Sequence, residues 1–307
     1  MYPNNKRYYT LDNYYKTRFG KKVFKVSLNG GFSCPNKDGT IASSACIYCS
    51  KSGSGEFGGN PKKSIEEQFE EVKNVTLKKW ETNLYIAYFQ ANTNTYAPLE
   101  RLKFLYESAL NIEGVIGLAI ATRADSISDE VLDYLEELNK RTYLSIELGL
   151  QTIHEKTSKL IKRGHSLKTF EEMVKKLRAR NIEVVVHIIN GLPNETKEEM
   201  LATVKYLNNL DIQGIKIHML AVLKNTELEN LYQKEKFHLL SREEYVDIVC
   251  SQLEVLKKEI VIHRVTTDPD PKDLIAPLWL RKKFVVMNEI DKLMKKRKTH
   301  QSSKIGS

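Results

Sequence analysis

Three cysteines lie close together in a glycine-flanked stretch, at Cys34, Cys46 and Cys49. The C-x2-C spacing of Cys46 and Cys49 lets two thiolates bind one metal centre, and Cys34 precedes them across a loop that can fold back. A structural zinc site uses four protein ligands, and this loop contains no histidine. The spacing therefore indicates a metal centre that lacks one protein ligand, and favours an iron–sulfur cluster over zinc or purely structural cysteines.

The rest of the composition is that of a globular protein. The 307 residues are 41% hydrophobic and 28% charged, so the chain can bury a sizeable core. The sequence contains no apolar run long enough to span a bilayer, and its first residues lack the apolar segment of a secretory signal. We expect a cytoplasmic, reducing location, where disulfides are rare. The fourth cysteine, Cys250, falls in a helical pattern and is expected to be a buried hydrophobic residue.

Positive charge is concentrated near the two ends of the chain. The net charge is +9, and the surplus lies at Lys16, Arg18, Lys21 and Lys22 and again between Arg281 and Lys298. Such a surplus favours a polyanionic partner such as a nucleic acid. A solvated basic helix end is the alternative interpretation of the C-terminal lysines.

Strand-like and helix-like segments alternate through most of the sequence. The short apolar strands are predicted at Phe24–Ser27, Leu84–Phe89, Ile116–Ala121, Tyr143–Leu148, Val184–Ile189 and Gly214–His218. Helices are predicted between them, and Ser64 with Glu67 and Thr196 with Glu199 match capping boxes. The other predicted helices are Leu99–Leu110, Asp129–Asn139, Leu167–Arg180 and Lys197–Asn209. This order predicts an α/β fold with a parallel sheet, either open or closed into a whole or partial barrel.

The pattern changes after about Leu223. A helix is predicted from Ser241 to about Lys258, followed by a strand at Ile260–Val265 and a final basic helix. We therefore predict an N-terminal extension at 1–21, a core at 22–223 and a C-terminal extension at 224–307. The last six residues, 302–307, are expected to be disordered.

The cysteine loop that follows the first strand resembles that of the radical S-adenosylmethionine (SAM) superfamily. The C-x11-C-x2-C spacing is similar to that of a narrower group, the proteins related to the catalytic subunit of Elongator. The resemblance covers about residues 22–223 and implies a partial (βα)6 barrel with short N-terminal and mixed α/β C-terminal extensions. It also implies a [4Fe–4S] cluster held by the three cysteines, with SAM on the open iron. Reduction by an external one-electron donor of the flavodoxin or ferredoxin type would then yield a 5′-deoxyadenosyl radical.

The same resemblance implies residues that bind SAM. Tyr48 matches the aromatic position near the adenine, and Gln90, Asn92 and Thr93 stand where the family has Gly-Gly-Glu. Glu147 matches an acidic position that contacts the ribose, and it is a carboxylate inside an apolar run, where a structural ion pair is the alternative.

Two further positions are implied near the fourth and fifth strands. Arg163, in Arg163-Gly164-His165, resembles an Arg-x-His element whose arginine contacts the SAM carboxylate; a surface helix-end residue is the alternative. His187 lies near the fifth strand end, where the family approaches SAM, and could equally be a core histidine.

Other polar residues at presumed strand ends are candidates without an assigned role. Thr122, Arg123 and Asp125 could contact substrate or pair with each other, and the extension adds His263, Arg264, Asp268 and Asp270.

The resemblance to Elongator implies a tRNA partner and modification of the C5 side chain of wobble uridine. We expect no acetyltransferase domain in so short a chain, so it would remodel an existing side chain, for example by removing a carboxymethyl group from carboxymethylaminomethyl uridine. One alternative is radical oxidation of a small molecule such as a porphyrinogen. The other is a non-catalytic, zinc-containing RNA-binding module.

Overall fold

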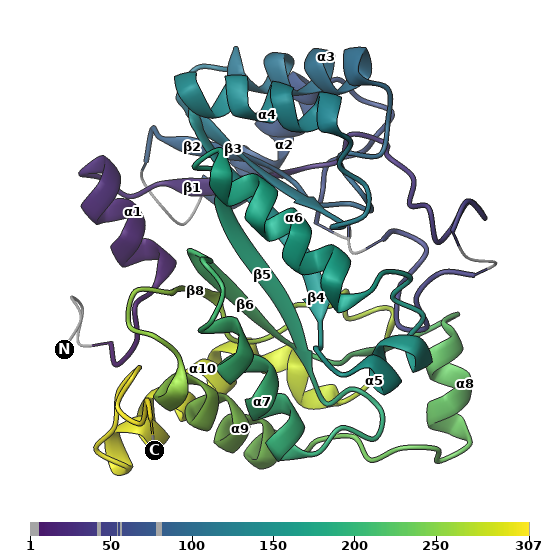
Figure 1. Cartoon of the computed structure of the whole chain (residues 1–307), viewed down its shortest axis with the longest axis vertical. Helices are drawn as coiled ribbons and strands as arrows, with labels where there is room; N and C mark the ends of the chain where they lie inside the picture. The colour runs from purple at the N-terminus through teal and green to yellow at the C-terminus, as the bar shows by residue number, and fades with distance from the viewer. Residues whose placement is uncertain (1–5, 42–43, 54, 56, 78–81, 307) are drawn as a thin grey trace.

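The computed structural model describes residues 6–41, 44–53, 55, 57–77 and 82–306 (Figure 1). Its centre is a parallel sheet of seven strands in the order β1-β2-β3-β4-β5-β6-β8, curled into a partial barrel. The strands are β1 Phe24–Leu28, β2 Tyr85–Phe89, β3 Val115–Thr122, β4 Tyr143–Gln151, β5 Glu183–Asn190, β6 Gly214–Met219 and β8 Val261–Arg264. All seven predicted strands are confirmed, and β4 continues past its predicted end to Gln151 through a register shift after Gly149.

Helices from the crossovers cover the outer face of the sheet (Figure 1). They are α2 Ile65–Leu77, α3 Leu99–Leu110, α4 Asp129–Arg141, α6 Leu167–Ala179 and α7 Lys197–Leu207. The short helix α5 Glu155–Leu160 lies instead at the carboxyl end of the sheet (Figure 1). The capping boxes at Ser64 and Thr196 form as predicted, with reciprocal side-chain bonds to Glu67 and Glu199. Of the helices within the described ranges, none combines the length and hydropathy needed to cross a lipid bilayer.

The strands are buried on both faces, which explains why their sequences are continuously apolar. In β2, Ala87 and Phe89 pack in the large core between sheet and helices, whereas Ile86 and Tyr88 face the barrel interior. All five β2 residues are buried. Alternate residues of a strand point to opposite faces, so each strand contributes to both environments.

A short helix that the sequence analysis did not predict closes the N-terminal end of the barrel. Helix α1, Leu11–Phe19, is capped by the Thr10 side chain and ends at Gly20, whose φ of 71° suits glycine. Tyr15 is 2% exposed, and its ring packs edge-on against Tyr143 at the start of β4, with centroids 6.1 Å apart. The helix therefore fills the end of the barrel opposite the carboxyl ends of the strands (Figure 1).

The residues before α1 lie beside the last strand of the sheet. The Ile262 amide donates to the Tyr9 carbonyl at 2.7 Å, and Thr10 bridges to Ile262 in parallel. The Tyr9 amide in turn donates to Oε1 of Gln301 at 2.8 Å. The expectation that residues 302–307 are disordered is wrong for 302–306, because the Ser302 and Lys304 amides donate to carbonyls of the helix that contains Glu254.

The C-terminal stretch contributes both to the sheet and to a helical layer. It contains α8 Glu227–Gln233, α9 Arg242–Val255, the 3-10 helix η2 Leu278–Lys282 and α10 Lys283–Lys296. Strands β7 Val222–Leu223 and β9 Leu274–Ala276 form a separate antiparallel pair. Since β8 extends the main sheet beside β6, this stretch supplies the seventh strand of the barrel. The boundary at residue 223 stays a prediction.

Shortening Tyr15 tests the contribution of α1 to stability. Tyr15→Ala should lower the free energy of unfolding by about 3 kcal/mol, because it empties a site between buried rings. Tyr15→Phe is the control and should change it by less than about 1 kcal/mol, since the buried hydroxyl has no hydrogen-bond partner among the described residues. Urea unfolding of the three proteins measures the difference, and equal midpoints for Ala and wild type would show that α1 is not part of the stable core.

Candidate active site

The loop after β1 carries the three cysteines and is fixed to the body of the protein at several points. Nδ2 of Asn36 donates to the Lys162 carbonyl at 2.9 Å and to the Arg163 carbonyl at 3.1 Å, and lies 3.4 Å from Sγ of Cys46. Ile47 is 2% exposed, and its amide donates to the Ile161 carbonyl. The loop is therefore anchored on the segment that follows α5, not held by its own residues alone.

Gly164 is needed for this anchor. Its φ is +91°, and a Cβ at this position would lie 2.6 Å from Oδ1 of Asn36. Any side chain would therefore push Asn36 away from the cysteine loop.

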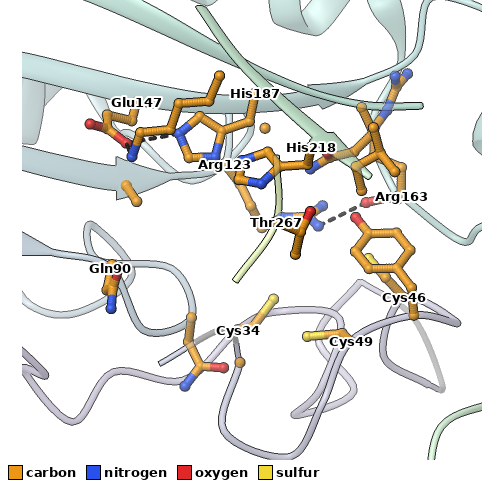
Figure 2. Close-up of a pocket in the computed structure, with 18 of the residues that line it drawn as sticks. Cys34, Cys46, Cys49, Gln90, Arg123, Glu147, Arg163, His187, His218 and Thr267 are labelled. Carbon is orange, nitrogen blue, oxygen red and sulfur yellow. Dashed lines mark hydrogen bonds and ion pairs between the residues drawn. The ribbon is translucent and has the colours of Figure 1, made fainter. Parts of the chain in front are cut away.

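The three thiols line one cavity of about 280 Å³ at the carboxyl ends of the strands. Figure 2 shows the cysteine loop on one side of this cavity, with Glu147 and His187 on the strands opposite. Within the described ranges, no three His, Cys, Asp or Glu side chains are grouped so as to hold a single metal ion. Three thiolates on an iron–sulfur cluster bind different irons, so the donor set fits such a cluster.

A cation lies beside the thiols. Arg123, just after β3, donates through Nε and Nη2 to the two carboxylate oxygens of Asp125 at 2.9 and 2.7 Å. Its Nη1 donates to the Arg163 carbonyl at 2.7 Å. Burial raises the pKa of the Cys46 thiol, and the charge of Arg123 opposes this rise. The pairing of Arg123 with Asp125 is one of the two arrangements expected for these residues.

The polar loop after β2 closes a second side of the cavity. Asn92, with a φ of 59°, donates to the Phe32 carbonyl at 3.0 Å and accepts from Nζ of Lys37 at 2.9 Å. The Thr93 amide donates to the Ser33 carbonyl. The side-chain amide of Gln90, in contrast, has no hydrogen-bond partner among the described residues and lines the cavity (Figure 2). The side chain of Asn92 is therefore engaged within the protein, whereas the side chain of Gln90 is available to a ligand.

Glu147 forms the centre of a polar layer inside the barrel, made of Lys25, Tyr88, Glu147, His187 and Lys216. Its Oε1 is 2.7 Å from Nζ of Lys25, and its Oε2 accepts from His187 at 2.8 Å and from Lys216. Nζ of Lys216 also donates to the Tyr88 hydroxyl at 2.9 Å. Four strands thus meet at one carboxylate whose side chain is fully buried.

Burial raises the pKa of Glu147. The two lysines and His187 together lower it by more, so the pKa lies well below its usual value. Both carboxylate oxygens have partners within the protein. The geometry therefore favours the ion pair over the contact with ribose, which stays a prediction.

Arg163 is almost completely buried, and its guanidinium is used by backbone carbonyls. Nη1 donates to Leu150 and Thr152 at 2.8 and 2.7 Å, and Nε and Nη2 donate to His165 at 3.0 and 2.8 Å. These bonds tie the end of β4 to the loop that anchors the cysteines. The alternative interpretation of Arg163 as a surface residue at a helix end is therefore wrong. Its contact with a SAM carboxylate stays a prediction.

His187 pairs with Glu147, and its ring centroid is 5.2 Å from that of His218. Burial and the charge of Lys216 lower the pKa of His187 to about 4, so the ring is neutral at pH 7 and Nε2 donates to the carboxylate. Nε2 of His218 is buried and has no partner among the described residues.

All ten predicted site residues line this single cavity: Cys34, Cys46, Cys49, Tyr48, Gln90, Asn92, Thr93, Glu147, Arg163 and His187. Asp268 and Asp270 do not line it; Asp268 pairs with Lys283, and Asp270 accepts from the Lys272 amide. The sequence analysis missed Lys25 and Lys216. The sequence did contain a signal for them, because each is a charged residue within an otherwise apolar strand. Glu147 was identified by the same criterion.

Comparison with protein families identifies the chain. The family described as the Radical SAM superfamily matches residues 36–207, and the Radical_SAM C-terminal domain matches residues 212–296. The chain belongs to the radical SAM superfamily. The family and the partial barrel predicted from the sequence are therefore both confirmed.

Relatives of this radical SAM protein differ in how much of it they match. The uncharacterized protein YtqA of Bacillus subtilis (strain 168) is 48% identical over 296 residues, which cover 96% of this chain and 92% of YtqA. The tRNA uridine(34) acetyltransferase of Methanocaldococcus infernus is 26% identical over 156 residues, covering 50% of this chain and 29% of that enzyme.

A solved structure shares the fold. The archaeal Methanocaldococcus infernus Elp3 with an N-terminal deletion matches with a TM-score of 0.66 and 17% identity, over 91% of this chain and 64% of that one. At this identity the likeness concerns the fold alone.

The lowered pKa of His187 predicts how stability depends on pH. Its pKa is about 4 in the folded protein and 6.5 ordinarily, so the unfolded chain binds more protons between these values and stability falls as pH falls through that window. His187→Gln should reduce the slope of unfolding free energy against pH by about 1.4 kcal/mol per pH unit there. Urea unfolding between pH 7 and 5 measures it, with the exposed His238→Gln as control. An unchanged slope in His187→Gln would contradict the assignment.

Proposed function

We propose that this radical SAM enzyme modifies the C5 side chain of the wobble uridine of tRNA. The observation that carries the proposal is the single cavity in which three thiols face the polar ends of the strands. The choice of tRNA is supported by the partial similarity to tRNA uridine(34) acetyltransferase and by the net charge of +9.

The residues around the thiols suit the cofactors that the family implies. Cys34, Cys46 and Cys49 would hold a [4Fe–4S] cluster, and Arg123 offsets part of the negative charge of the thiolates. When bound, the cluster and SAM together supply one-electron cleavage of SAM to methionine and a 5′-deoxyadenosyl radical. The protein's part is to hold the thiolates in place, which Asn36 and Ile47 do, and to exclude water.

Two residues are placed to receive SAM without losing bonds that they already make. Tyr48 is partly buried beside Cys46 and offers an aromatic face to an adenine. Gln90 offers an amide with free donors and acceptor. Arg163 already uses four of its five N–H donors on backbone carbonyls, which leaves one for a SAM carboxylate, so Gln90 and Tyr48 are the stronger assignments.

The opening at the carboxyl ends of the strands suits a base that leaves an RNA loop. Sequence-specific recognition of RNA targets unstacked bases of single-stranded loops, and an anticodon base is of this kind. The cavity of about 280 Å³ is the size of a small ligand, so an extruded uridine side chain, not a helical segment, would enter it.

Loss of one cysteine tests the cofactor assignment. After anaerobic reconstitution, Cys34→Ala should lose most of its iron and sulfide, and 5′-deoxyadenosine formed with dithionite and SAM should fall roughly a hundredfold or more. Cys250→Ala is the matched control, since this thiol is buried in α9 and faces the Ile290 carbonyl. It should keep its iron and lose about 1 kcal/mol of stability. Full iron and activity in Cys34→Ala, or stoichiometric zinc in the wild type, would reject the assignment.

Modified nucleosides test the tRNA assignment. Cells that lack the gene should accumulate the unremodelled wobble uridine, for example carboxymethylaminomethyl uridine, and lose the product, as measured by mass spectrometry of digested tRNA. Restoring the gene should restore the product, whereas the Cys34→Ala gene should not. If wobble uridines are identical with and without the gene, tRNA is not the substrate.

A further inference from the structure

Apart from the three cysteines, the side chains that line the cavity carry more positive than negative charge. Among the described residues that line it, Glu147 is the one carboxylate, and four side chains are cationic: Arg123, Arg163, Lys216 and Arg264. Arg123 is paired with Asp125, and Arg163 with backbone carbonyls. Lys216 and Lys25 both pair with Glu147, so this carboxylate already balances the charge of two lysines. No carboxylate of the described lining residues is left to pair with Arg264.

A bulge in the edge strand brings Arg264 beside Lys216. Ile215 of β6 pairs with Ile262 of β8, but the next residue, Lys216, pairs with Arg264. His263 is therefore an extra residue, and bulges of this kind redirect neighbouring side chains. His263 turns toward Gly214, where a Cβ would lie 2.6 Å from its Nε2. Glycine at 214 thus makes room for the bulge that places Arg264 at the cavity.

The guanidinium of Arg264 has no hydrogen-bond or ion-pair partner in the part of the chain that the structure describes, and the residue is exposed. It also borders a second hollow, of about 300 Å³, that contains Asp12 and Asp268. Those carboxylates pair with Lys16 and Lys283 instead. Burial lowers the pKa of Lys216, and the charges of Lys25 and Arg264 lower it further, although Glu147 opposes them. An added anion would relieve this repulsion.

We propose that Arg264, with Lys216 behind it, binds a carboxylate at the end of the substrate side chain. The planar fork of an arginine matches the two oxygens of a carboxylate, and charge-assisted bonds of this kind are among the strongest in proteins. The inference rests on the proposed function only in naming that substrate as a wobble uridine; the carboxylate site itself follows from the charges and the bulge.

Two other anions could reach an arginine here, and the structure disfavours both. The carboxylate of SAM would be held on the cysteine side of the cavity in this family, whereas Arg264 lies on the last strand of the sheet, in register with Lys216. A backbone phosphate of RNA can contact the exposed guanidinium, but to reach the buried Lys216 as well it would have to enter the cavity of about 280 Å³ together with its ribose. A carboxylate at the end of a flexible side chain can reach both cations.

The first arm of the test uses acetate and its neutral isostere acetamide on the cluster-loaded protein. Acetate, but not acetamide, should raise the unfolding temperature by about 2–4 °C at a tenfold excess over its Kd, since a ligand stabilises the state that binds it. The shift should persist in Arg281→Gln, which removes a guanidinium outside the cavity, and disappear in Arg264→Gln. Equal shifts in all three proteins, or none in the wild type, would overturn the carboxylate site.

The second arm measures affinity for 5-carboxymethylaminomethyluridine, 5-aminomethyluridine and SAM. The wild type should prefer the carboxylated nucleoside, and Arg264→Gln should lose roughly tenfold or more of that preference while its Kd for SAM stays unchanged. A loss confined to SAM would assign Arg264 to the cofactor, and a loss confined to whole tRNA would assign it to a phosphate; either would overturn the inference. If acetate stabilises the wild type but not Arg264→Gln, and neither nucleoside binds, then the carboxylate site is supported and the assignment of uridine as the substrate fails.

Discussion

Burial of the Glu147 carboxylate inside the barrel is the constraint on which the rest of the structure depends. A partial barrel lacks the hydrogen bonds that would join its first and last strands, so its curvature needs support from within. Glu147 on β4 contacts Lys25 on β1, His187 on β5 and Lys216 on β6. An ion that is removed from water must be fully paired, which restricts these strands to one arrangement. The position of the strand ends, and hence the width of the cavity, follows from this pairing.

The cysteine loop depends on a second set of contacts, because its described residues lack the regular backbone hydrogen bonds of a helix or a sheet. Asn36 and Ile47 join it to the segment after α5, and Arg163 joins that segment to the end of β4. The Arg163-Gly164-His165 stretch is thus a support for the thiols: arginine satisfies backbone carbonyls, and glycine leaves room for Asn36. The thiols are positioned by a chain of hydrogen bonds that begins in the sheet.

The sequence predicts the sheet well because its strands are buried on both faces and therefore continuously apolar. It predicts the cysteine site because the spacing of Cys34, Cys46 and Cys49 is local. It cannot predict which cations meet Glu147, because Lys25 and Lys216 lie far from it in the chain and join it only when the sheet curls. Helix α1 was missed for a related reason. Its apolar face combines two tyrosines with Leu11 and Phe19, and the burial of Tyr15 against Tyr143 depends on tertiary packing.

The contact between Tyr9, Thr10 and the last strand has a consequence for biosynthesis. These residues are synthesised long before Ile262 and Gln301, to which they bind. The N-terminal end of the barrel is therefore completed only after Gln301 has been synthesised, and until then the tyrosines of helix α1 lack part of their final surroundings. A nascent chain that pauses within α9 still lacks β8, so the edge of β6 is unpaired at that stage.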